Sequence, residues 1–463
     1  MKKIVIVGCG FSGTMTAVQL IKNASQPFEL IIIGDRETFN TGIAYNPYSK
    51  KQLLNVITSR MSAFQDNPDD FLNWVSARDE FSGTDRGILA SAFLPRYLYG
   101  QYLRDIWKKA VQSSEAQKVK ITIIHAIVLD MDVSGDEVTL ILDNDEKVKA
   151  QYCVIATGNQ LPGNIDIKDK HFYSSTNYYR NPWDVSTVHP HDPNAPVLIL
   201  GNGLTMADTV LGLVENGFRN KIYTLSPHGY SILPHKHLGI GYAAVNEELQ
   251  GKQSLYDIVR IVNKHIRLAS KLGFTAEPII DAIRPLTQKL WQNLTNREKR
   301  IFLSRLRHLW DSVRHRIPMH IHEKLGQLTE IGTLDQYAGK VLEITENEGN
   351  IRVRFFDIKQ KVEKEMLVSA VINCTGPVTD LMKAESSFLK ECLIKGILKQ
   401  DDLKLGIMVD PSTFEVCNGV NEPQKNIMVI GSLLKGVLWE STAVKELREQ
   451  SEILAKYLVC KMM

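Results

Sequence analysis

The sequence predicts an α/β protein with two Rossmann-like dinucleotide-binding domains, each followed by a β-meander, and with a helical insertion. Three observations predict this fold class. A buried strand, a glycine turn and a helix begin near residue 4, the same plan recurs near residue 196, and the β pattern gives way to helix between residues 251 and 317. Two strand–glycine turn–helix units in one chain predict two dinucleotide sites.

The first dinucleotide motif is at residues 4–13, where Ile-Val-Ile-Val is followed by Gly-Cys-Gly-Phe-Ser-Gly. The first glycine permits a tight turn, the second lets the backbone approach a pyrophosphate, and the third allows close packing of helix on strand. The helix N-terminus offers N–H donors and a positive dipole end to the same pyrophosphate. The residues expected to bind the nucleotide are Gly8, Gly10, Phe11, Ser12 and Gly13.

A second apolar strand follows at residues 30–34 and ends at Asp35, 22 residues after Gly13. A carboxylate at this position accepts hydrogen bonds from the adenosine ribose. We therefore expect Asp35 and its neighbour Arg36 to contact the nucleotide. The alternative is an ordinary glycine-rich turn with a solvent-exposed Asp35.

The same plan recurs from residue 196 to residue 207, with Ala207 in place of the third glycine. A small residue at this position still permits close helix–strand packing. Another strand follows at residues 221–225, as it does after the first motif. The residues expected to bind the second nucleotide are Gly201, Gly203, Leu204 and Thr205.

The end of this second strand informs the choice of nicotinamide nucleotide. It reads Leu-Ser-Pro-His at residues 225–228, with neither an acid for the 2′-hydroxyl of NADH nor an arginine for the 2′-phosphate of NADPH. The basic candidates nearby are His228, His235, Lys236 and His237. We favour NADPH, with NADH as one alternative and a fold that has lost its dinucleotide as another.

Segments with the period-2 alternation of a β-meander follow each motif. The first meander is expected at 119–124, 137–142 and 147–149, and the second at 339–343, 351–356 and 362–367. Both lead into similar strands, which end in Ala-Thr-Gly at 156–158 and in Cys-Thr-Gly at 374–376. Because small residues let a cofactor lie against the backbone, Thr157 and Gly158 join the residues expected at the first dinucleotide site.

This paired arrangement resembles the two-dinucleotide-binding flavoproteins, in which the N-terminal site holds FAD and the inserted site receives NADH or NADPH. Further segments resemble one bacterial FAD/NAD(P)-binding family: G-x-A-Y at 42–45, L-L-N-V at 53–56, F-L-x-W at 71–74 and W-D…R-H-R at 310–316. The resemblance spans nearly the whole chain and implies a cofactor-binding role for Asn55. A urate hydroxylase is similar to this family, which suggests an aromatic heterocycle as substrate. Arginines typical of the family are absent at Pro227 and His228.

The C-terminal segment is expected to return to the flavin. A strand at 427–432 ends in small residues, and a helix is expected to begin at Ser441. In similar flavoproteins such a helix directs its N-terminus at the flavin pyrimidine, where its dipole stabilises negative charge. The alternative is an ordinary amphipathic helix. The residues implied at the cofactor are Gly431, Trp439, Glu440, Ser441 and Thr442.

The helical middle carries basic residues at regular spacing. Arg300, Arg307 and Arg314 fall seven apart, with His315 and Arg316 nearby. One interpretation is a basic wall for an anionic substrate or the NADPH phosphate. The other is a solvated face with ion pairs to Glu298 and Asp311. The two H-x-H pairs, at 235–237 and 320–322, lack a third ligand at a recognisable spacing, so no metal is expected.

The composition restricts the class of partner. A formal net charge of +3 over 463 residues does not indicate nucleic-acid or membrane binding, and no apolar stretch reaches a membrane-spanning length. The strand at residues 4–7 leaves no room for a signal peptide, so we expect a cytoplasmic protein. None of the six cysteines forms a C-x-x-C pair, which argues against a dithiol acceptor.

We therefore expect a FAD-binding domain at 1–160 plus 370–463, an NAD(P)-binding domain at 190–250 plus 318–370, and a helical insertion at 251–317. The expected function is that of a FAD-dependent oxidoreductase, an NAD(P)H-dependent monooxygenase that hydroxylates a small molecule. The alternatives are a flavin reductase or dehydrogenase without oxygen chemistry and a non-catalytic FAD-binding regulator. The sequence indicates neither a catalytic base nor an oligomeric state.

Overall fold

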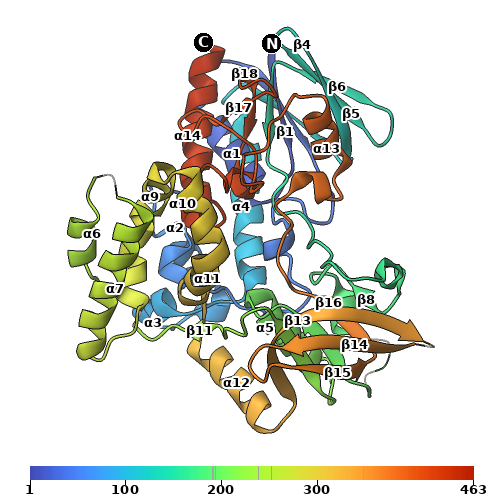
Figure 1. Ribbon diagram of the computed structural model, residues 1–463. Coiled ribbons are helices and arrows are strands. Elements are labelled where there is room, and N and C mark those ends of the chain that lie inside the picture. The colour runs from blue at the N-terminus through green and yellow to red at the C-terminus, as the bar shows by residue number, and fades with distance from the viewer. Residues whose placement is uncertain (190–191, 193, 238, 252, 348) are drawn as a thin grey trace. The chain divides into compact units, whose positions relative to one another are not determined.

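The computed structural model describes residues 1–463 except 190–191, 193, 238, 252 and 348 (Figure 1). It consists of two compact units, Met1–Gln160 with Thr379–Met463, and Leu161–Val378. The second unit is thus inserted into the chain of the first. The expected domain border at residue 190 lies outside the described residues.

A six-stranded sheet forms the centre of the first unit, in the order β17-β18-β7-β1-β2-β3. All neighbouring strands are parallel except β17, which is antiparallel to β18. Strand β2 is buried along its whole length, as expected for a parallel strand covered on both faces. The strands are β1 (Lys2–Val7), β2 (Phe28–Ile33), β3 (Val119–Ile124), β7 (Tyr152–Ile155), β17 (Glu415–Cys417) and β18 (Pro423–Val429).

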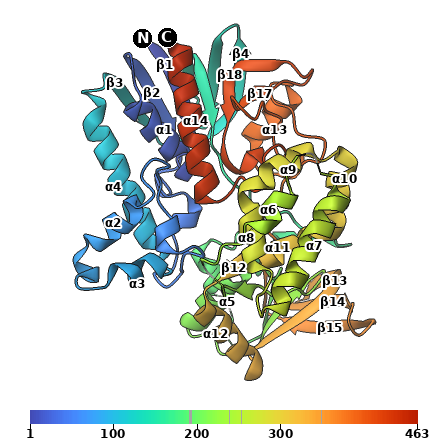
Figure 2. The same cartoon turned by 90° about the vertical axis from the view of Figure 1, so that its left-hand side faces the viewer.

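Helices and a small meander complete the first unit. The C-terminal helix α14 packs against α1, as Figure 2 shows, and α13 packs against β4. The helices are α1 (Phe11–Lys22), α2 (Asp70–Ser76), α3 (Arg86–Ser91), α4 (Arg96–Ser114), α13 (Ser387–Ile394) and α14 (Val444–Met462). The antiparallel meander consists of β4 (Val128–Ser134), β5 (Glu137–Leu142) and β6 (Lys147–Ala150).

Two predictions about the first unit are wrong in detail. Residues 119–124 do not belong to the meander, because β3 pairs in parallel with β2 at the edge of the large sheet. The meander begins instead with β4, whose polar residues Asp130 and Asp132 conceal its alternation. The C-terminal helix begins at Val444 and not at Ser441.

The second unit contains a seven-stranded sheet in the order β15-β14-β13-β10-β9-β16-β8. Strand β13 is parallel to β10 over residues 334–338 and antiparallel to β14 from residue 339 onward, so one strand belongs to both the Rossmann core and the meander. The strands are β8 (Tyr178–Tyr179), β9 (Val197–Leu200), β10 (Ile222–Ser226), β13 (Leu334–Asn347), β14 (Asn350–Asp357), β15 (Val362–Val368) and β16 (Ala370–Asn373).

The border expected at residue 370 is displaced in the structure. Strand β16 pairs with β8 and β9 and is therefore part of the second sheet. The chain returns to the first unit at Thr379. The Cys-Thr-Gly strand end consequently closes the second unit in the way that Ala-Thr-Gly closes the first.

The second unit also contains helices, most of them in the middle of the chain. They are α5 (Leu204–Glu215), α6 (Ala244–Glu248), α7 (Leu255–Lys271), α8 (Glu277–Ile283), α9 (Thr287–Asn293), α10 (Asn296–Ile301), α11 (Arg307–Arg314) and α12 (Met319–Glu330). A π-helical segment, Phe302–Leu306, joins α10 to α11. The short parallel strands β11 (Leu233–Pro234) and β12 (Arg316–Ile317) connect the loop after β10 to the end of α11. The predicted α/β fold class is confirmed.

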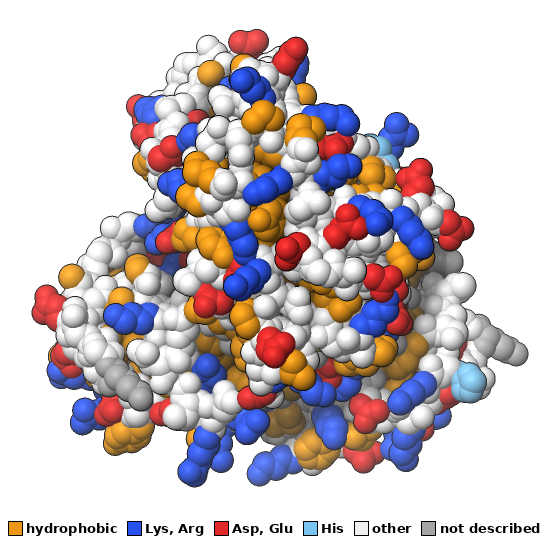
Figure 3. Space-filling model, turned by 90° about the horizontal axis from the view of Figure 1, so that it is seen from above, with side chains coloured by type: hydrophobic (Ala, Val, Ile, Leu, Met, Phe, Trp, Pro, Cys, Tyr) orange, Lys and Arg blue, Asp and Glu red, His pale blue; other side chains and the backbone are white. Residues whose placement is uncertain are grey.

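The surface in Figure 3 shows basic and acidic side chains interspersed, with small apolar areas between them. This mixture agrees with the nearly balanced totals of 55 basic and 52 acidic residues. Within the described part of the chain, every helix is too short or too polar to cross a bilayer.

Candidate dinucleotide sites

The first glycine loop is shaped by two close approaches. Gly8 has a φ of +102°, and a Cβ on it would lie less than 3.0 Å from the carbonyl oxygen of Ala156. A Cβ on Gly13 would similarly overlap the carbonyl oxygen of Gly8. Both positions therefore require glycine for the packing of β1, α1 and the end of β7, as the glycine pattern predicts.

The second glycine of the loop has a different environment. A Cβ on Gly10 would lie 3.5 Å from the Cα of Gly42, an ordinary van der Waals distance. The protein itself therefore leaves room for a methyl group at Gly10. The contact brings the segment that begins at Gly42 against the loop, which explains why G-x-A-Y and the glycine fingerprint occur together.

The N-terminus of α1 is open to a ligand. Gly10 is its N-cap residue, no side chain caps it, and its first turn contains no acidic residue. The first backbone hydrogen bond of the helix runs from the Thr14 N–H to the Gly10 carbonyl, at 2.9 Å. The N–H groups of the first turn thus have no partner within the helix, and a diphosphate fits this cradle.

Asp35 lies on an exposed turn directly after β2. Its Oδ2 accepts hydrogen bonds from the Thr38 N–H and the Thr38 hydroxyl, both at 2.9 Å. Partial burial alone would raise the pKa of Asp35, but these hydrogen bonds outweigh it and lower the pKa. The group is an ionised acceptor at neutral pH, as a ribose contact requires. Arg36 beside it is exposed.

The end of β7 contains a buried polar atom that the protein does not use. Within the described residues, the hydroxyl oxygen of Thr157 is buried and has no hydrogen-bond partner. The hydroxyl of Ser432, in the 3-10 turn that follows β18, is likewise buried and without a hydrogen-bond partner among the described residues. Strand β18 pairs with β7 up to Val429 and Ile155. Unsatisfied buried hydroxyls just beyond the ends of two paired strands indicate a place for a polar ligand. Ser432 was not among the residues expected at the cofactor.

The C-terminal segment reaches the first glycine loop at Gly431. A Cβ on Gly431 would lie 3.1 Å from the Ser12 hydroxyl. The Ser441 hydroxyl donates to the Gly431 carbonyl at 2.9 Å and accepts from Gln450 Nε2 at 2.6 Å, and the Gly431 N–H donates to Gln450 Oε1 at 3.3 Å. Ser441 and Gln450 are buried, so this closed network fixes the loop. Gln450 was not recognised from the sequence, since it lies nine residues after Ser441 and outside the motif.

The residues between Trp439 and the helix form a tight turn. Glu440 has a φ of +67°, and the Thr442 N–H donates to its carbonyl at 2.8 Å. This left-handed turn explains why α14 begins only at Val444. Trp439 is buried, with Lys435 Nζ 5.0 Å from its ring centroid. Thr442 is exposed, and no side chain caps α14.

The second glycine loop repeats the construction of the first. Gly201 has a φ of +107°, and a Cβ on it would overlap the carbonyl oxygen of Cys374, the counterpart of Ala156. Helix α5 begins at Leu204, Gly203 is its N-cap, and no side chain caps it. No protein atom lies within 4 Å of where a Cβ on Gly203 would be, among the described residues. Thr205 lies in the first turn of this helix.

Equivalent hydrogen bonds align the two sites residue by residue. The Gly8 N–H donates to Ile33 and the Gly201 N–H to Leu225, at 2.8 and 2.9 Å. Two residues after these acceptors stand Asp35 in the first site and Pro227 in the second. His228 therefore occupies the position of Arg36. Asn202 Nδ2 donates to the Tyr230 carbonyl at 2.7 Å and ties this turn to the glycine loop.

A buried ionic network supports the loop that follows. Glu277 accepts hydrogen bonds from His235 Nδ1 at 2.9 Å and from the N–H groups of Lys236 and His237 at 2.8 and 2.7 Å. Arg316 contacts Glu277 at 2.7 Å and Asp281 at 2.8 Å. Burial would raise the pKa of Glu277, but these donors and the Arg316 charge lower it to about 2. No local sequence pattern marks Glu277, which lies about 40 residues from its partners.

This network corrects the interpretation of the basic helix. Arg316 is 3% exposed and neutralised by two carboxylates, so it is not part of a basic wall. The π-helical segment between Arg300 and Arg307 also shifts the helical register, so these two arginines do not share the face that a regular helix would give them. Arg307 pairs with Asp311 at 3.3 Å, as the alternative interpretation predicts.

Glu298, the other carboxylate expected to pair with this face, acts as a capping residue. It forms a capping box with Thr295 at the start of α10 and also accepts from the Leu255 N–H at 2.9 Å. It therefore caps two helices. The described residues contain no cluster of three or more His, Cys, Asp or Glu side chains able to hold a metal ion.

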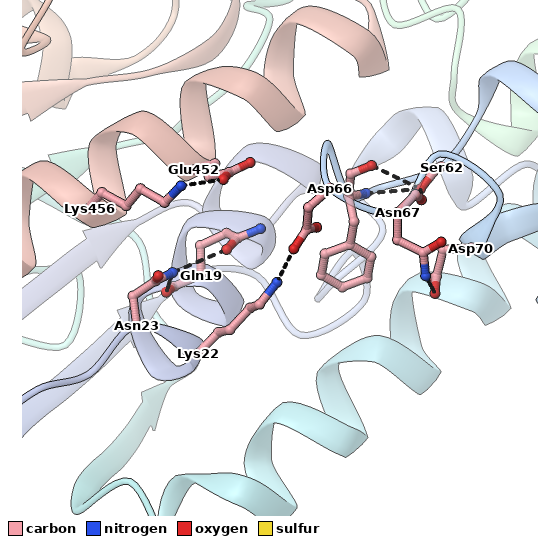
Figure 4. Close-up of polar contacts among 10 residues, drawn as sticks. Gln19, Lys22, Asn23, Ser62, Asp66, Asn67, Asp70, Glu452 and Lys456 are labelled. Atoms are coloured by element: carbon pink, nitrogen blue, oxygen red, sulfur yellow. Dashed lines mark hydrogen bonds and ion pairs between the residues drawn. The ribbon is translucent and has the colours of Figure 1, made fainter.

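A groove of about 520 Å³ lies on the first unit, between α1, α4 and the loop before α2. Figure 4 shows its polar residues in contact with one another: Lys22 with Asp66 at 2.6 Å and Asn67 with Asp70 at 2.9 Å. Lys22 ends α1, whereas the glycine loop precedes its first residue. The groove therefore does not include the residues predicted for FAD.

Residues 5–160 match the profile of a family described as FAD-NAD(P)-binding. The chain is 24% identical over 227 residues to the uncharacterized protein YdhS of Escherichia coli K12, and this match covers 47% of the chain and 40% of YdhS. The chain thus spans less than half the length of the curated relative it matches.

Solved structures decide the fold. L-lysine 6-monooxygenase from Pseudomonas syringae is 14% identical, with a TM-score of 0.66 and 100% and 99% of the two chains covered. Ornithine hydroxylase PvdA from Pseudomonas aeruginosa is 12% identical, with a TM-score of 0.63 and both chains fully covered. The chain has the two-dinucleotide-binding flavoprotein fold. The predicted resemblance to these flavoproteins is confirmed.

This flavoprotein fold also occurs in a reductase. The bacillithiol disulfide reductase Bdr from Staphylococcus aureus is 13% identical, with a TM-score of 0.56 and both chains fully covered. The predicted FAD and NAD(P) cofactors agree with the description of the matched family. Since monooxygenases and reductases share the fold, the fold alone does not decide between these reactions.

Proposed function

We propose that this protein is a FAD-dependent oxidoreductase that takes electrons from NADPH or NADH and hydroxylates a small molecule with oxygen. The observation that carries the proposal is the duplicated glycine cradle. Gly8 against Ala156 and Gly201 against Cys374 make the same close approach, and each precedes an uncapped helix N-terminus. One chain therefore offers a separate cradle to each of two dinucleotides.

The residues of the first unit suit FAD. The N–H groups of the first turn of α1 would hold the pyrophosphate, and the Asp35 carboxylate would accept from the adenosine ribose. The Thr157 and Ser432 hydroxyls, unsatisfied among the described residues, would bond to polar atoms of the cofactor. When bound, FAD supplies an acceptor for the nicotinamide hydride and a donor of electrons to the substrate reaction.

The C-terminal helix would contribute electrostatically. The uncapped N-terminus of α14 follows the Gly431 loop, which lies against Ser12. A helix N-terminus carries partial positive charge and stabilises an anionic group placed against it. We assign Ser441 and Gln450 a positioning role, because their hydrogen bonds fix this loop and leave the hydroxyl of Ser441 engaged within the protein.

The cysteines of the chain favour oxygen over a dithiol as acceptor. All six are free, and Cys9, Cys153, Cys374 and Cys392 are buried. Burial raises the pKa of Cys9, in the first glycine loop, to about 11, so its thiol is not a nucleophile at neutral pH. The lysine and ornithine hydroxylases with the same fold support hydroxylation of a small molecule. The structure of the disulfide reductase makes a reductase the second candidate.

The first test is anaerobic stopped-flow reduction of the FAD-loaded protein by NADPH and by NADH. Bleaching of the flavin absorbance by either nucleotide is expected. Aerobic reactions with lysine, ornithine and urate then follow substrate-dependent oxygen uptake and the hydroxylated product by mass spectrometry. Bleaching without product from a broader set of amines and aromatic heterocycles would favour the reductase. A bound flavin that neither nucleotide reduces would refute the proposed function.

A further inference from the structure

Two histidines from distant parts of the sequence meet beside the second glycine loop. The ring centroids of His228, after β10, and His308, at the start of α11, lie 3.9 Å apart, with the rings inclined by 47°. His228 also stacks on Tyr230, with centroids 5.8 Å apart. Among the described residues, neither imidazole makes a hydrogen bond, and His228 is exposed. Both rings can therefore engage a ligand.

Their place in the fold identifies the part of the ligand that they would meet. The aligned hydrogen bonds of the two glycine loops put His228 just beyond the strand end where the adenosine ribose is recognised. Asn202, between Gly201 and Gly203, holds this turn through the Tyr230 carbonyl. A 2′-phosphate on the ribose is the feature that distinguishes NADPH from NADH at this position.

Charged residues on α11 surround the ring of His308. Arg307 and Asp311, both on α11, pair with each other at 3.3 Å, and Asp311 also lies 4.0 Å from His315. Burial, followed by the charges of His228 and Arg307, lowers the pKa of His308, while Asp311 opposes them. An anion beside the ring of His308 would oppose these effects and favour its protonated form. A phosphate dianion would supply that anion and accept an N–H from each ring.

The segment that precedes His308 is also unusual. The π-helical turn Phe302–Leu306 ends directly before Arg307 and sets the register with which α11 begins. Such turns are rare and frequently occur at functional sites. The turn changes which side chains α11 directs toward the loop after β10, and His308 is one that reaches it.

We infer that His228 and His308 form a proton-dependent phosphate site that selects NADPH over NADH by taking up a proton as the 2′-phosphate binds. The inference rests on the proposed function, because it assigns the nicotinamide nucleotide to the second glycine loop. It predicts that the preference for NADP⁺ over NAD⁺ is stronger at pH 7.0 than at pH 8.5, because the site loses its proton as the pH rises.

Isothermal titration calorimetry of the full, FAD-loaded chain with NADP⁺ and NAD⁺ tests this directly. Measurements at pH 7.0 and 8.5 avoid most of the titration of the 2′-phosphate itself, whose second pKa is about 6. NADP⁺ affinity is expected to fall about fivefold to tenfold between these pH values, and NAD⁺ affinity less than about twofold. Two buffers of different ionisation enthalpy at pH 7.0 should reveal net proton uptake with NADP⁺ only.

The variants H228N and H308Q, singly and together, test the assignment of the site. The double variant should bind NADP⁺ and NAD⁺ with similar affinity at both pH values. H320Q, a histidine exchange on the exposed start of α12, is the matched control and should behave as wild type. FAD content and circular dichroism report folding, and the proton-uptake measurement on wild type needs no variant.

The outcomes separate this inference from the proposed function. A preference for NADP⁺ that does not change with pH would assign the phosphate to Arg307 or Lys236 and overturn the inference. Equal affinity for the two nucleotides at pH 7.0, or no binding of either, would also overturn it. Proton-linked NADP⁺ binding without flavin reduction by NADPH would support the site and refute the oxidoreductase.

Discussion

Glu277 and Arg316 form a buried ion pair, with Oε1 and Nη1 2.7 Å apart and both side chains 3% exposed. The pair connects α8 to β12. Strand β12 in turn pairs with β11, which lies in the loop after β10. Since Glu277 also accepts from the N–H groups of Lys236 and His237, one carboxylate fixes the backbone of the loop.

Glu277→Gln should destabilise the second unit by about 3–5 kcal/mol, because Arg316 would lose its most buried partner. The urea unfolding midpoint, followed by circular dichroism, measures the effect. Asp281→Asn is the comparison, since Asp281 is 25% exposed and pairs with the same guanidinium. A Glu277→Gln variant as stable as wild type would show that the network contributes little.

The same carboxylate makes stability depend on acid pH. The pKa of Glu277 is lowered from 4.5 to about 2, so its contribution is complete above about pH 4.5 and is lost as pH falls toward 2. The difference in unfolding free energy between wild type and Glu277→Gln should therefore narrow across this window. A difference that stays constant from pH 7 to pH 3 would contradict the lowered pKa.

Gly10→Ala and Gly203→Ala should separate ligand binding from folding. Neither added methyl group meets a protein atom closer than 3.5 Å, so unfolding midpoints should remain near wild type. A pyrophosphate lying on these backbones would be displaced, so Gly10→Ala should weaken FAD binding and Gly203→Ala nicotinamide nucleotide binding, each at least about tenfold. Fluorescence titration measures both. Gly201→Ala, which overlaps Cys374, should instead reduce folded yield.

Ser441→Ala should cost about 1–3 kcal/mol, because it leaves the Gly431 carbonyl and the Gln450 amide buried without their partner. Thr442→Ala, one residue further and exposed, should be nearly neutral. Thermal unfolding of both variants without FAD makes the comparison. If Ser441→Ala lowers FAD affinity and leaves the apoprotein stable, Ser441 contacts the cofactor directly.

Thr157→Val tests the unsatisfied hydroxyl at the end of β7. The apoprotein should lose no stability, since the described residues provide no partner for this oxygen. FAD affinity should fall about tenfold if the hydroxyl bonds to the cofactor. Thr58→Val is the control, because the Thr58 hydroxyl donates to the Ala92 carbonyl at 2.9 Å and its loss should destabilise the fold.

Local sequence patterns were sufficient for the two glycine loops. The fingerprints at Gly8 and Gly201 are only a few residues long. Each of these glycines is required because a Cβ there would overlap a neighbouring carbonyl oxygen, so the local pattern is enough to predict the shape of the loop. Strand alternation was less specific. Residues 119–124 alternate as a meander strand would, yet the same alternation suits a half-exposed edge strand such as β3.

Long-range partners could not be predicted in the same way. Arg316 lies near Arg300, Arg307 and Arg314 in sequence and resembled a member of a basic face. Its environment depends on Glu277, 39 residues earlier, which no periodicity connects to it. The π-helical turn before Arg307 could not be predicted from the sequence either, because apolar residues continue through it at the three- and four-residue spacing of an ordinary α-helix.

Strand β13 belongs to two architectures at once, since residues 334–338 extend the Rossmann core and the following residues start the meander. Strand β13 therefore joins the two parts of the second unit through one continuous backbone. A hinge between the nucleotide-binding core and the meander would have to break hydrogen bonds that β13 makes with β10 before residue 339 and with β14 after it. We expect the two parts to turn as one body whenever the unit moves, with amide hydrogen exchange protected continuously along the strand.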